Sequence, residues 1–384
     1  MQLTPEGNLQ MTEQDAQPLP TQQSASPKRL KTLQTKALSI LERKPCLLYT
    51  ICSVAALAFM ALVLAWNNTS LVWYWDGMGQ WYVNFSMLKD TIIDLVSNGN
   101  FDFWSWDVGL GQDTIGYLST FLFNPFAWIC VFFDENNMDV CFTLVLFIEL
   151  YFAGLAACVY LHHLKLDSWI CTLGALAYIF SATVSGALNE FIFIFPVVVF
   201  PLIILGIDLV YERKTPLVLV LSGGVVALNY LYMTYMIVVI SLLYVIVKTI
   251  FFALEAGAKR AFQRLASLIA YVLLAAIIVS PLLAPSLCAL LSNSKESNYT
   301  FQLLPTVPDW FTFIPTLFSA QNAVENSIWA SIGVLGTLAL LAPFVFARIK
   351  KRCVHSTVFA IALVAAFIPV CRSIMNAGSY TTAR

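Results

Sequence analysis

The sequence predicts an all-α polytopic integral membrane protein with about nine transmembrane helices. Of its 384 residues, 59% are hydrophobic and only 11% are charged, whereas an ordinary soluble domain has roughly 25% charged residues. A soluble chain of this size could not bury so much apolar surface in one core, but a bilayer can, because lipid replaces water as the solvent. This composition excludes a soluble enzyme.

The first 44 residues differ from the rest of the chain. Residues 1–26 are rich in Gln, Pro, Thr and Ser and contain no apolar stretch, a composition typical of disorder. We expect a disordered, basic cytoplasmic tail over 1–44 and an uncleaved signal-anchor helix over 45–66, because that apolar run is long enough to span. The basic residues of the tail are Lys28, Arg29, Lys31, Lys36, Arg43 and Lys44.

Runs of roughly 20 apolar residues, the length that crosses about 30 Å of hydrocarbon, give the remaining spans. Pro196 and Pro201 should kink the fourth span, and Pro281 and Pro285 the seventh. Polar and aromatic residues over 229–235 separate the fifth span from the sixth. The spans expected after 45–66 are 139–161, 170–188, 191–210, 216–232, 234–254, 266–291, 327–347 and 355–371.

The distribution of basic residues predicts a cytoplasmic N-terminus. With that orientation, 17 of the 21 Lys and Arg residues lie on the cytoplasmic side. Within the spans, Glu149 and Asp208 are ionisable, and we expect them to face the interior of the bundle or a cavity.

The loop over 67–138 is expected outside the cell, and it is acidic and contains six Trp residues. Apolar side chains of residues 80–97 fall within about 100° of helical arc, while Asn84 and Asp90 lie on the polar side. This pattern predicts a helix along the outer membrane surface. Residues 117–133 are apolar but are interrupted at Asn124 and Pro125, so we expect a re-entrant or interfacial segment there.

Several motifs follow one another in a fixed order. They are WDGMGQWYVNF at 75–85, GNF at 99–101, WSWDVGLGQD at 104–113, NPF at 124–126, NYLYMTY at 229–235 and NAG at 376–378, followed by Arg384. In order and spacing they resemble the YfhO-like bacterial membrane proteins over residues 45–384. Members of that family are considerably longer, so we expect a truncated member that lacks the C-terminal part.

YfhO-like proteins are similar to the GT-C glycosyltransferases, and the resemblance implies a transmembrane GT-C-like domain over 45–384 in the bacterial plasma membrane. It implies transfer of a hexosyl or N-acetylhexosaminyl group from a polyprenyl-phosphate donor to a cell-envelope polymer of the teichoic-acid type on the outer face. The partners would be these substrates and membrane lipids, with no nucleic acid. In that superfamily an acidic residue after the first span performs the chemistry, and the matching residue is Asp76. Arg384 is expected to bind substrate.

The residues around Asp76 suit such a role without demanding it. A general base must lie within about 2.6–3.2 Å of the acceptor proton, and Asp76 lies shortly after the first span, which ends at Trp66. Trp75 and Trp81 suit the headgroup zone and could stack on a sugar, and Gln80 lies one helical turn on from Asp76. In the alternative, structural role, Asp76 is the N-cap of the helix that follows.

Other polar residues of the outer face give weaker signals. Asp107 and Asp113 bracket Gly109 and Gly111, a loop in which a ligand could approach the backbone, although an ordinary turn explains the pattern better. Two or three carboxylates could bind Mg²⁺ or Mn²⁺, but their spacing alone does not establish a metal site. Glu190 lies at the turn between the third and fourth spans and either faces a cavity or is solvated.

Two other functions stay open. A transporter or flippase of lipid-linked envelope precursors would also be polytopic, but it usually has broken helices in two repeated halves, and the sequence shows no internal repeat. A non-catalytic protein of envelope assembly is the other alternative. The concentration of polar residues in one outer loop favours an outward-facing enzyme.

The topology predicts which positions reagents can reach in intact cells. Thiols engineered into residues 98–112 should react with a membrane-impermeant maleimide, and thiols in 211–215 or 348–352 should not. Labelling of 348–352 from outside would contradict the predicted orientation.

Overall fold

The structure is a computed structural model that describes residues 44–188, 190–292, 353–367 and 371. Its helices are α2 (Pro45–Trp66), α3 (Tyr82–Asn98), α4 (Thr114–Leu122), α5 (Met138–His163), α6 (Ser168–Ile179), α7 (Ala182–Ala187), α8 (Ile194–Tyr211), α9 (Leu217–Leu228), α10 (Leu231–Ala256), α11 (Ala258–Ser292) and α15 (Cys353–Phe367). Between them lie short 3₁₀ or π turns and one antiparallel ribbon: η1 (Gly77–Trp81), η2 (Ala127–Phe132), η3 (Glu135–Asn137), η4 (Phe191–Phe193), β1 (Trp104–Ser105) and β2 (Gln112–Asp113).

Five helical segments in the described part of the chain are long and apolar enough to cross a membrane. They are Pro45–Trp66, Glu135–His163, Phe191–Tyr211, Leu231–Ala256 and Ala258–Cys288. The chain is therefore an all-α polytopic membrane protein, as its composition predicted. The count of nine spans is not confirmed, and the span expected over 327–347 lies outside the described residues.

Two expected spans are shorter than predicted, and of the span expected over 355–371 the residues 368–370 lie outside the described part of the chain. The span expected over 170–188 is two helices, α6 and α7, because the chain breaks at Ser181, whose hydroxyl oxygen accepts a hydrogen bond from the N–H of Val184 at 3.3 Å and caps α7. Helix α9 has 12 residues, a length of about 18 Å that falls short of the hydrocarbon core. Helix α15 has 15 residues. The predicted break near 229–235 is confirmed, because α9 and α10 are separate helices.

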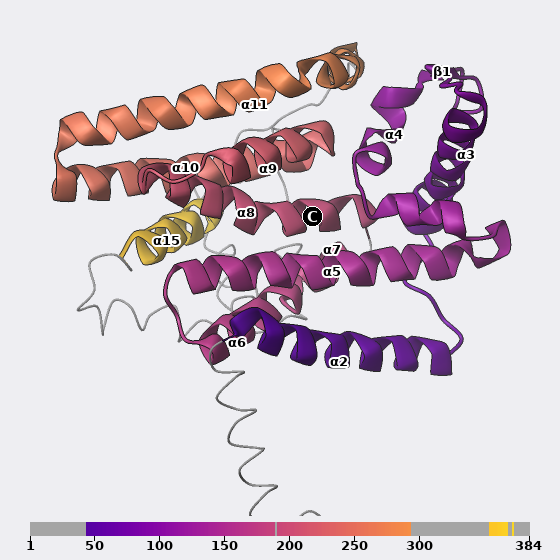
Figure 1. Cartoon of the computed structure of the whole chain (residues 1–384). Coiled ribbons are helices and arrows are strands. Elements are labelled where there is room, and N and C mark those ends of the chain that lie inside the picture. The colour runs from indigo at the N-terminus through magenta and orange to yellow at the C-terminus, as the bar shows by residue number, and fades with distance from the viewer. Residues whose placement is uncertain (1–43, 189, 293–352, 368–370, 372–384) are drawn as a thin grey trace, which may run out of the picture.

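Figure 1 shows the long helices side by side, with α5 between α2 and α8 and with α9 and α11 beyond α8. Helix α3 lies at a steep angle to the long helices, near one end of α5, and α4 and β1 lie beside it. Pro201 lies inside α8, and Pro281 and Pro285 lie inside α11. Pro196 is in the first turn of α8, where a missing N–H leaves no helical hydrogen bond unmade.

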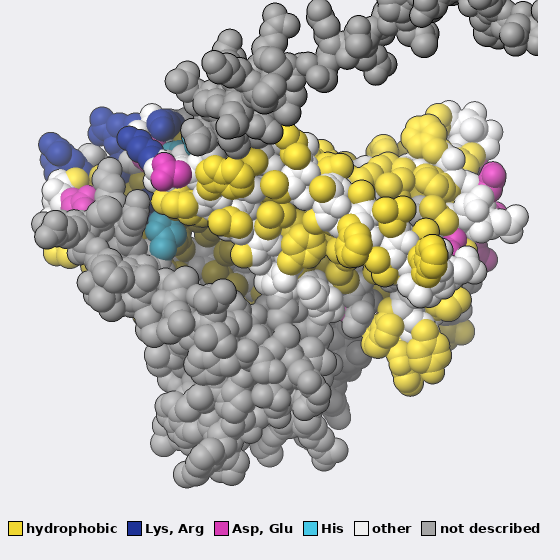
Figure 2. Space-filling model, turned by 90° about the horizontal axis from the view of Figure 1, so that it is seen from below, with side chains coloured by type: hydrophobic (Ala, Val, Ile, Leu, Met, Phe, Trp, Pro, Cys, Tyr) yellow, Lys and Arg dark blue, Asp and Glu magenta, His cyan; other side chains and the backbone are white. Residues whose placement is uncertain are grey.

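Charged side chains separate along the bundle. Figure 2 shows Lys and Arg gathered at one end, several Asp and Glu at the other, and a hydrophobic surface between them. At the basic end, Glu212 lies 3.2 Å from His163 and 2.8 Å from Lys214. Near the start of α2, Tyr49 packs with Cys158 of α5. The described residues thus place the first turns of α2 beside the C-terminal half of α5; that this side is cytoplasmic stays a prediction.

Helix α3 buries its apolar face against protein. Phe85, Leu88 and Ile92 are buried, and α3 packs on η2, α4 and α5. The prediction of an amphipathic helix is confirmed, but for these three residues the prediction that the apolar face rests on lipid is wrong, because neighbouring helices cover it. Asn84, expected on the polar side, is also buried, and Val96, expected on the apolar side, is 78% exposed.

Four phenylalanine rings form the centre of this packing. Phe85 of α3 lies with its ring centroid 4.8 Å from Phe191, 5.4 Å from Phe121 and 5.4 Å from Phe142. Phe121 stacks on Phe191 at 5.1 Å. Each ring is at most 1% exposed, and aromatic pairs contribute about 0.5–1.5 kcal/mol beyond the area they bury. This cluster joins α3, α4, α5 and η4.

A buried amide holds the turn between α4 and η2. Asn124 donates from Nδ2 to Oε1 of Glu149 on α5 at 2.5 Å, and its Oδ1 accepts from the N–H of Phe126 at 3.1 Å. Both Asn124 and Glu149 are 0% exposed. Glu149 therefore faces the interior of the bundle, as predicted, and the segment over 117–133 is two short elements rather than a crossing.

The second ionisable residue within the spans, Asp208, is also buried. Its carboxylate accepts from the hydroxyl of Tyr244 at 2.6 Å and from Nζ of Lys248 at 2.5 Å. Tyr160 of α5 is hydrogen-bonded to Nε2 of His355 on α15. Asp208 thus faces the interior, as predicted, and ties α8 to α10.

Removing the Asn124 amide should destabilise the fold. In Asn124→Ala, Glu149 keeps its buried carboxyl but loses the hydrogen bond from Asn124, and an unmade buried hydrogen bond costs about 1–3 kcal/mol. We expect a lower midpoint of thermal unfolding in detergent. The control is Asn136→Ala, at an exposed position of η3. Equal midpoints for the two variants would contradict this account.

Candidate functional site

Asp76 lies after α2, at the start of the π turn η1. It is half-buried, and its Oδ1 accepts a hydrogen bond from Nε2 of Gln80 at 2.8 Å. Its side chain makes no capping hydrogen bond to the backbone of η1, so the alternative role as an N-cap finds no support in the geometry. Single π turns are frequent at functional sites, and this turn places Gln80 beside the carboxylate.

Trp81 and Glu190 connect this turn to the bundle. The indole Nε1 of Trp81 donates to Oε2 of Glu190 at 2.8 Å, although the two residues are 109 positions apart in the chain. Glu190 directly precedes Phe191, whose buried ring contacts Phe85. The aromatic cluster thereby fixes the two backbone segments from which Trp81 and Glu190 extend.

The two carboxyl groups influence each other. Burial raises the pKa of Glu190, the hydrogen bond from Trp81 opposes that rise, and the charge of Asp76, together with a hydrogen bond to it, raises the pKa again. Asp76 and Glu190 are therefore close neighbours. We call Asp76, Gln80, Trp81 and Glu190 the carboxylate cluster.

The carboxylate cluster offers the groups that a hydroxyl-activating site needs. A carboxylate can accept a proton as a general base, and the amide of Gln80 orients that of Asp76. The indole of Trp81 is half-buried and held by Glu190, so it presents a fixed apolar face. Trp75, predicted to bind substrate, is 63% exposed and packs edge-on against Tyr74.

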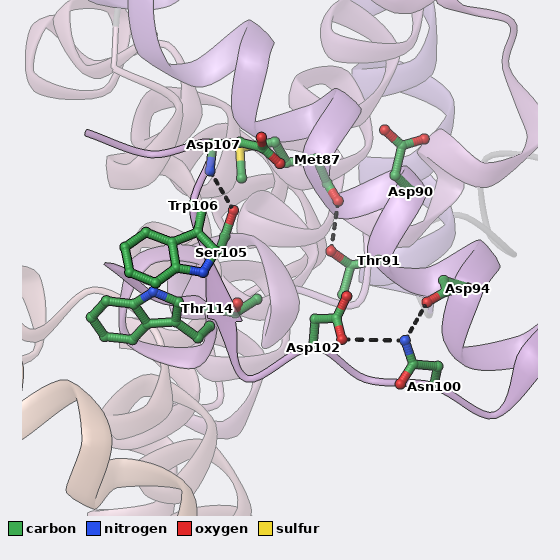
Figure 3. Close-up of a pocket in the computed structure, with 11 residues that line it drawn as sticks. Met87, Asp90, Thr91, Asp94, Asn100, Asp102, Ser105, Trp106, Asp107 and Thr114 are labelled. Atoms are coloured by element: carbon green, nitrogen blue, oxygen red, sulfur yellow. Dashed lines mark hydrogen bonds between the residues drawn. The ribbon is translucent and has the colours of Figure 1, made fainter. Parts of the chain in front are cut away.

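The remaining predicted residues lie elsewhere. Asp113 caps α4, because its carboxylate accepts a hydrogen bond from the N–H of Gly116; this is the structural role that an aspartate in a turn usually has. Asp107 lines a separate pocket (Figure 3) whose lining includes no member of the carboxylate cluster. Arg384 lies outside the described residues.

The metal expectation gains no support from the described geometry. Among residues 44–188, 190–292, 353–367 and 371, no group of three or more His, Cys, Asp and Glu side chains is arranged to hold a metal ion. The possible sites for Mg²⁺ or Mn²⁺ inferred from the acidic loop therefore remain a prediction.

Sequence reasoning named three members of the carboxylate cluster but did not connect Glu190 to them. The sequence alone indicated that Glu190 lies at an outer turn and that the indole of Trp81 is near Asp76. What the sequence lacks is a local signal that two segments 109 positions apart meet, because that contact depends on how α3 and η4 pack.

The raised pKa of Glu190 predicts a pH-dependent stability difference. A carboxyl whose pKa is higher folded than unfolded holds more protons in the folded state, so its contribution to stability falls as pH rises through that interval. Glu190→Gln keeps an acceptor for Trp81 and removes the ionisation. We expect the variant to gain stability relative to the wild type as pH rises above the ordinary pKa of a glutamate, about 4.3, measured as the thermal midpoint in detergent.

Glu135→Gln, at an exposed position of η3, is the control. A difference that does not change with pH, or that the control shares, would contradict the environment inferred for Glu190.

Comparison with known proteins assigns the chain to a family. The family model described as "Bacterial membrane protein YfhO" matches residues 50–383. Neither the curated proteins nor the solved structures contain a match. The matched range includes the carboxylate cluster and every described membrane span except the first turn of α2. The chain belongs to the YfhO family of bacterial membrane proteins.

Proposed function

We propose that this protein is a membrane glycosyltransferase that moves a sugar from a polyprenyl-phosphate donor to a hydroxyl of a cell-envelope polymer, with teichoic-acid-type polymers as the leading candidates. The observation that carries the proposal is the carboxylate cluster at the ends of membrane-spanning helices. Glu190 directly precedes the span Phe191–Tyr211. Asp76 follows the span Pro45–Trp66 by ten residues. A donor anchored in lipid and an acceptor in water can meet at such a position.

Asp76 would act as the general base. The acceptor oxygen forms a bond to the anomeric carbon of the donor sugar, the bond from that carbon to the phosphate oxygen breaks, and polyprenyl phosphate leaves with the electron pair. The hydroxyl proton of the acceptor passes to Asp76. Gln80 would orient the carboxylate, as its 2.8 Å hydrogen bond suggests, and Glu190 would hold the indole of Trp81 against the sugar.

The proposal includes the orientation. The N-terminus would be cytoplasmic, so the carboxylate cluster would face outward, at the opposite membrane surface from the basic end of the bundle. On the face shown in Figure 2, Lys and Arg side chains gather at one end, which is the pattern that the positive-inside rule expects of the cytoplasmic side; Lys89, in α3, is a described exception.

The alternative of a transporter or flippase has one observation in its favour. Asp208 and Lys248 form a buried ion pair within the spans, and intramembrane ionisable groups often mark transport pathways. That alternative predicts that Asp208→Asn, rather than Asp76→Asn, would stop sugar from reaching the envelope polymer.

Asp76→Asn should abolish transfer while leaving expression and membrane insertion intact. Asparagine keeps the size of the side chain and an oxygen that can accept from Gln80, but it removes the basicity of the carboxylate. Loss of a general base typically slows a reaction about 10²- to 10⁴-fold. The measurement is sugar incorporated into purified envelope polymer by cells that express each variant.

The matched control is Asp134→Asn, at an exposed position between η2 and η3, which should transfer at the wild-type rate. If Asp76→Asn retained the wild-type rate, Asp76 would not be the base, and Glu190 would be the next residue to test.

A further inference from the structure

A second cavity lies between α3 and the β1–β2 ribbon, apart from the carboxylate cluster. Its volume is about 550 Å³. Figure 3 shows Trp106 and Ser105 on one side, Asp94 and Asn100 on the other, and Thr114 between them. The cavity, which we call the ribbon pocket, is lined by Met87, Asp90, Thr91, Asp94, Asn100, Asp102, Trp104, Ser105, Trp106, Asp107 and Thr114.

Two indoles form an apolar wall of the ribbon pocket. Trp104 and Trp106 meet with ring centroids 5.7 Å apart and planes at 69°. They pack over Gly111, where a Cβ atom would come within 2.7 Å of Nε1 of Trp104 and 2.8 Å of Cε3 of Trp106. Gly111 also has φ +99°, which side chains rarely adopt. Glycine at this position is what lets the indoles lie against the loop.

The carboxylates of the ribbon pocket differ in what they already bind. Asp94 accepts from the side-chain amides of Asn98 at 2.6 Å and Asn100 at 3.0 Å. Asp90 and Asp107 are exposed, and neither carboxylate makes a hydrogen bond or ion pair with another described residue, whereas the backbone N–H of Asp107 donates to Oγ of Ser105 at 3.2 Å. Their oxygens are available to a ligand that donates hydrogen bonds.

Thr114 supplies an independent sign of a ligand. Its side chain lines the ribbon pocket, the residue is only 5% exposed, and its hydroxyl finds no hydrogen-bond partner among the described residues. A buried hydroxyl without a partner is unfavourable. The oxygen itself is closed off from solvent, so a ligand in the pocket would satisfy it after a small shift of the side chains around it.

The lining restricts the chemistry of that ligand. Four carboxylates and no Lys, Arg or His side chain line the pocket, so an anionic group such as a phosphate would be repelled. The described residues contain no arrangement suited to a metal ion. A sugar ring fits all the features, because its hydroxyls donate to carboxylates and accept from Thr114, while its C–H face can lie on an indole.

We propose that the ribbon pocket binds an uncharged sugar ring. Any part that this site plays in sugar transfer rests on the proposed function, whereas the binding of a neutral sugar ring stands without it. The phosphates of a teichoic-acid-type acceptor would be repelled by the lining carboxylates, so that part of the polymer is not the ligand. None of its lining residues belongs to the carboxylate cluster, so the ribbon pocket is a site separate from that of the proposed reaction.

Binding can be measured without transfer. The full chain is placed in phosphatidylcholine nanodiscs, which avoid sugar-based detergents, and saturation-transfer NMR is recorded with methyl β-glucoside, methyl β-galactoside or methyl β-N-acetylglucosaminide. Methyl glucuronide and methylammonium are the anionic and cationic comparison probes. We expect at least one neutral glycoside to bind with a Kd on the order of 1 mM, and the glucuronide to bind at least about tenfold more weakly.

Variants of the lining residues locate the site. Trp106→Ala and Asp107→Asn, both at exposed positions, should each weaken binding about tenfold or more. Thr114→Val should weaken it about two- to tenfold. Trp66→Ala and Asp134→Asn, at exposed positions outside the pocket, should bind as the wild type does.

Three results would overturn the proposal: no saturation transfer from any neutral glycoside, binding of the glucuronide or methylammonium as tight as that of the glycosides, or unchanged binding by both Trp106→Ala and Asp107→Asn. Because no sugar is transferred in this assay, its failure leaves the Asp76 test unaffected. Likewise, an active Asp76→Asn variant would not remove the binding site.

Discussion

The packing of four phenylalanine rings is the interaction on which the rest of the outer region depends. Phe85, Phe121, Phe142 and Phe191 come from four separate elements, and each is almost fully buried. Apolar contact has no directional requirement of its own, but the edge-on and stacked ring geometries hold α3 and η4 in a defined relation. The carboxylate cluster depends on this apolar packing for its position more than on its own hydrogen bonds.

Buried polar pairs set the geometry of the bundle deeper in the membrane. Glu149 with Asn124 joins α5 to the turn between α4 and η2, and Asp208 with Lys248 joins α8 to α10. Such pairs add little net stability, since removing them from water costs nearly as much as their attraction returns. Their effect is on specificity: a sliding or rotated helix would leave a polar group without a partner in an apolar surrounding.

The sequence predicted the long spans well and the short helices poorly. The helix over Pro45–Trp66 matched its apolar run, because hydropathy and length suffice for a helix surrounded by lipid. Hydropathy does not distinguish lipid from a covering helix, so the buried face of α3 and the break at Ser181 were missed. In the candidate site, Asp76, Gln80 and Trp81 were named from local spacing, whereas the contact of Glu190 with Trp81 required knowledge of tertiary packing. Asp113 caps α4, and its role in binding substrate stays a prediction.

The π turn over Gly77–Trp81 carries a consequence for how this family can vary. A π turn is an α-helical turn with one residue added, and each residue advances a helix by about 100°. Loss of a single residue between Asp76 and Trp81 would restore a regular helix and leave the buried face of α3 in register. It would also swing Asp76 by about that angle relative to Glu190. An insertion or deletion at this point can therefore change the relative orientation of the two carboxyl groups without changing the fold. A descendant chain could keep its structure while its two carboxyl groups point apart.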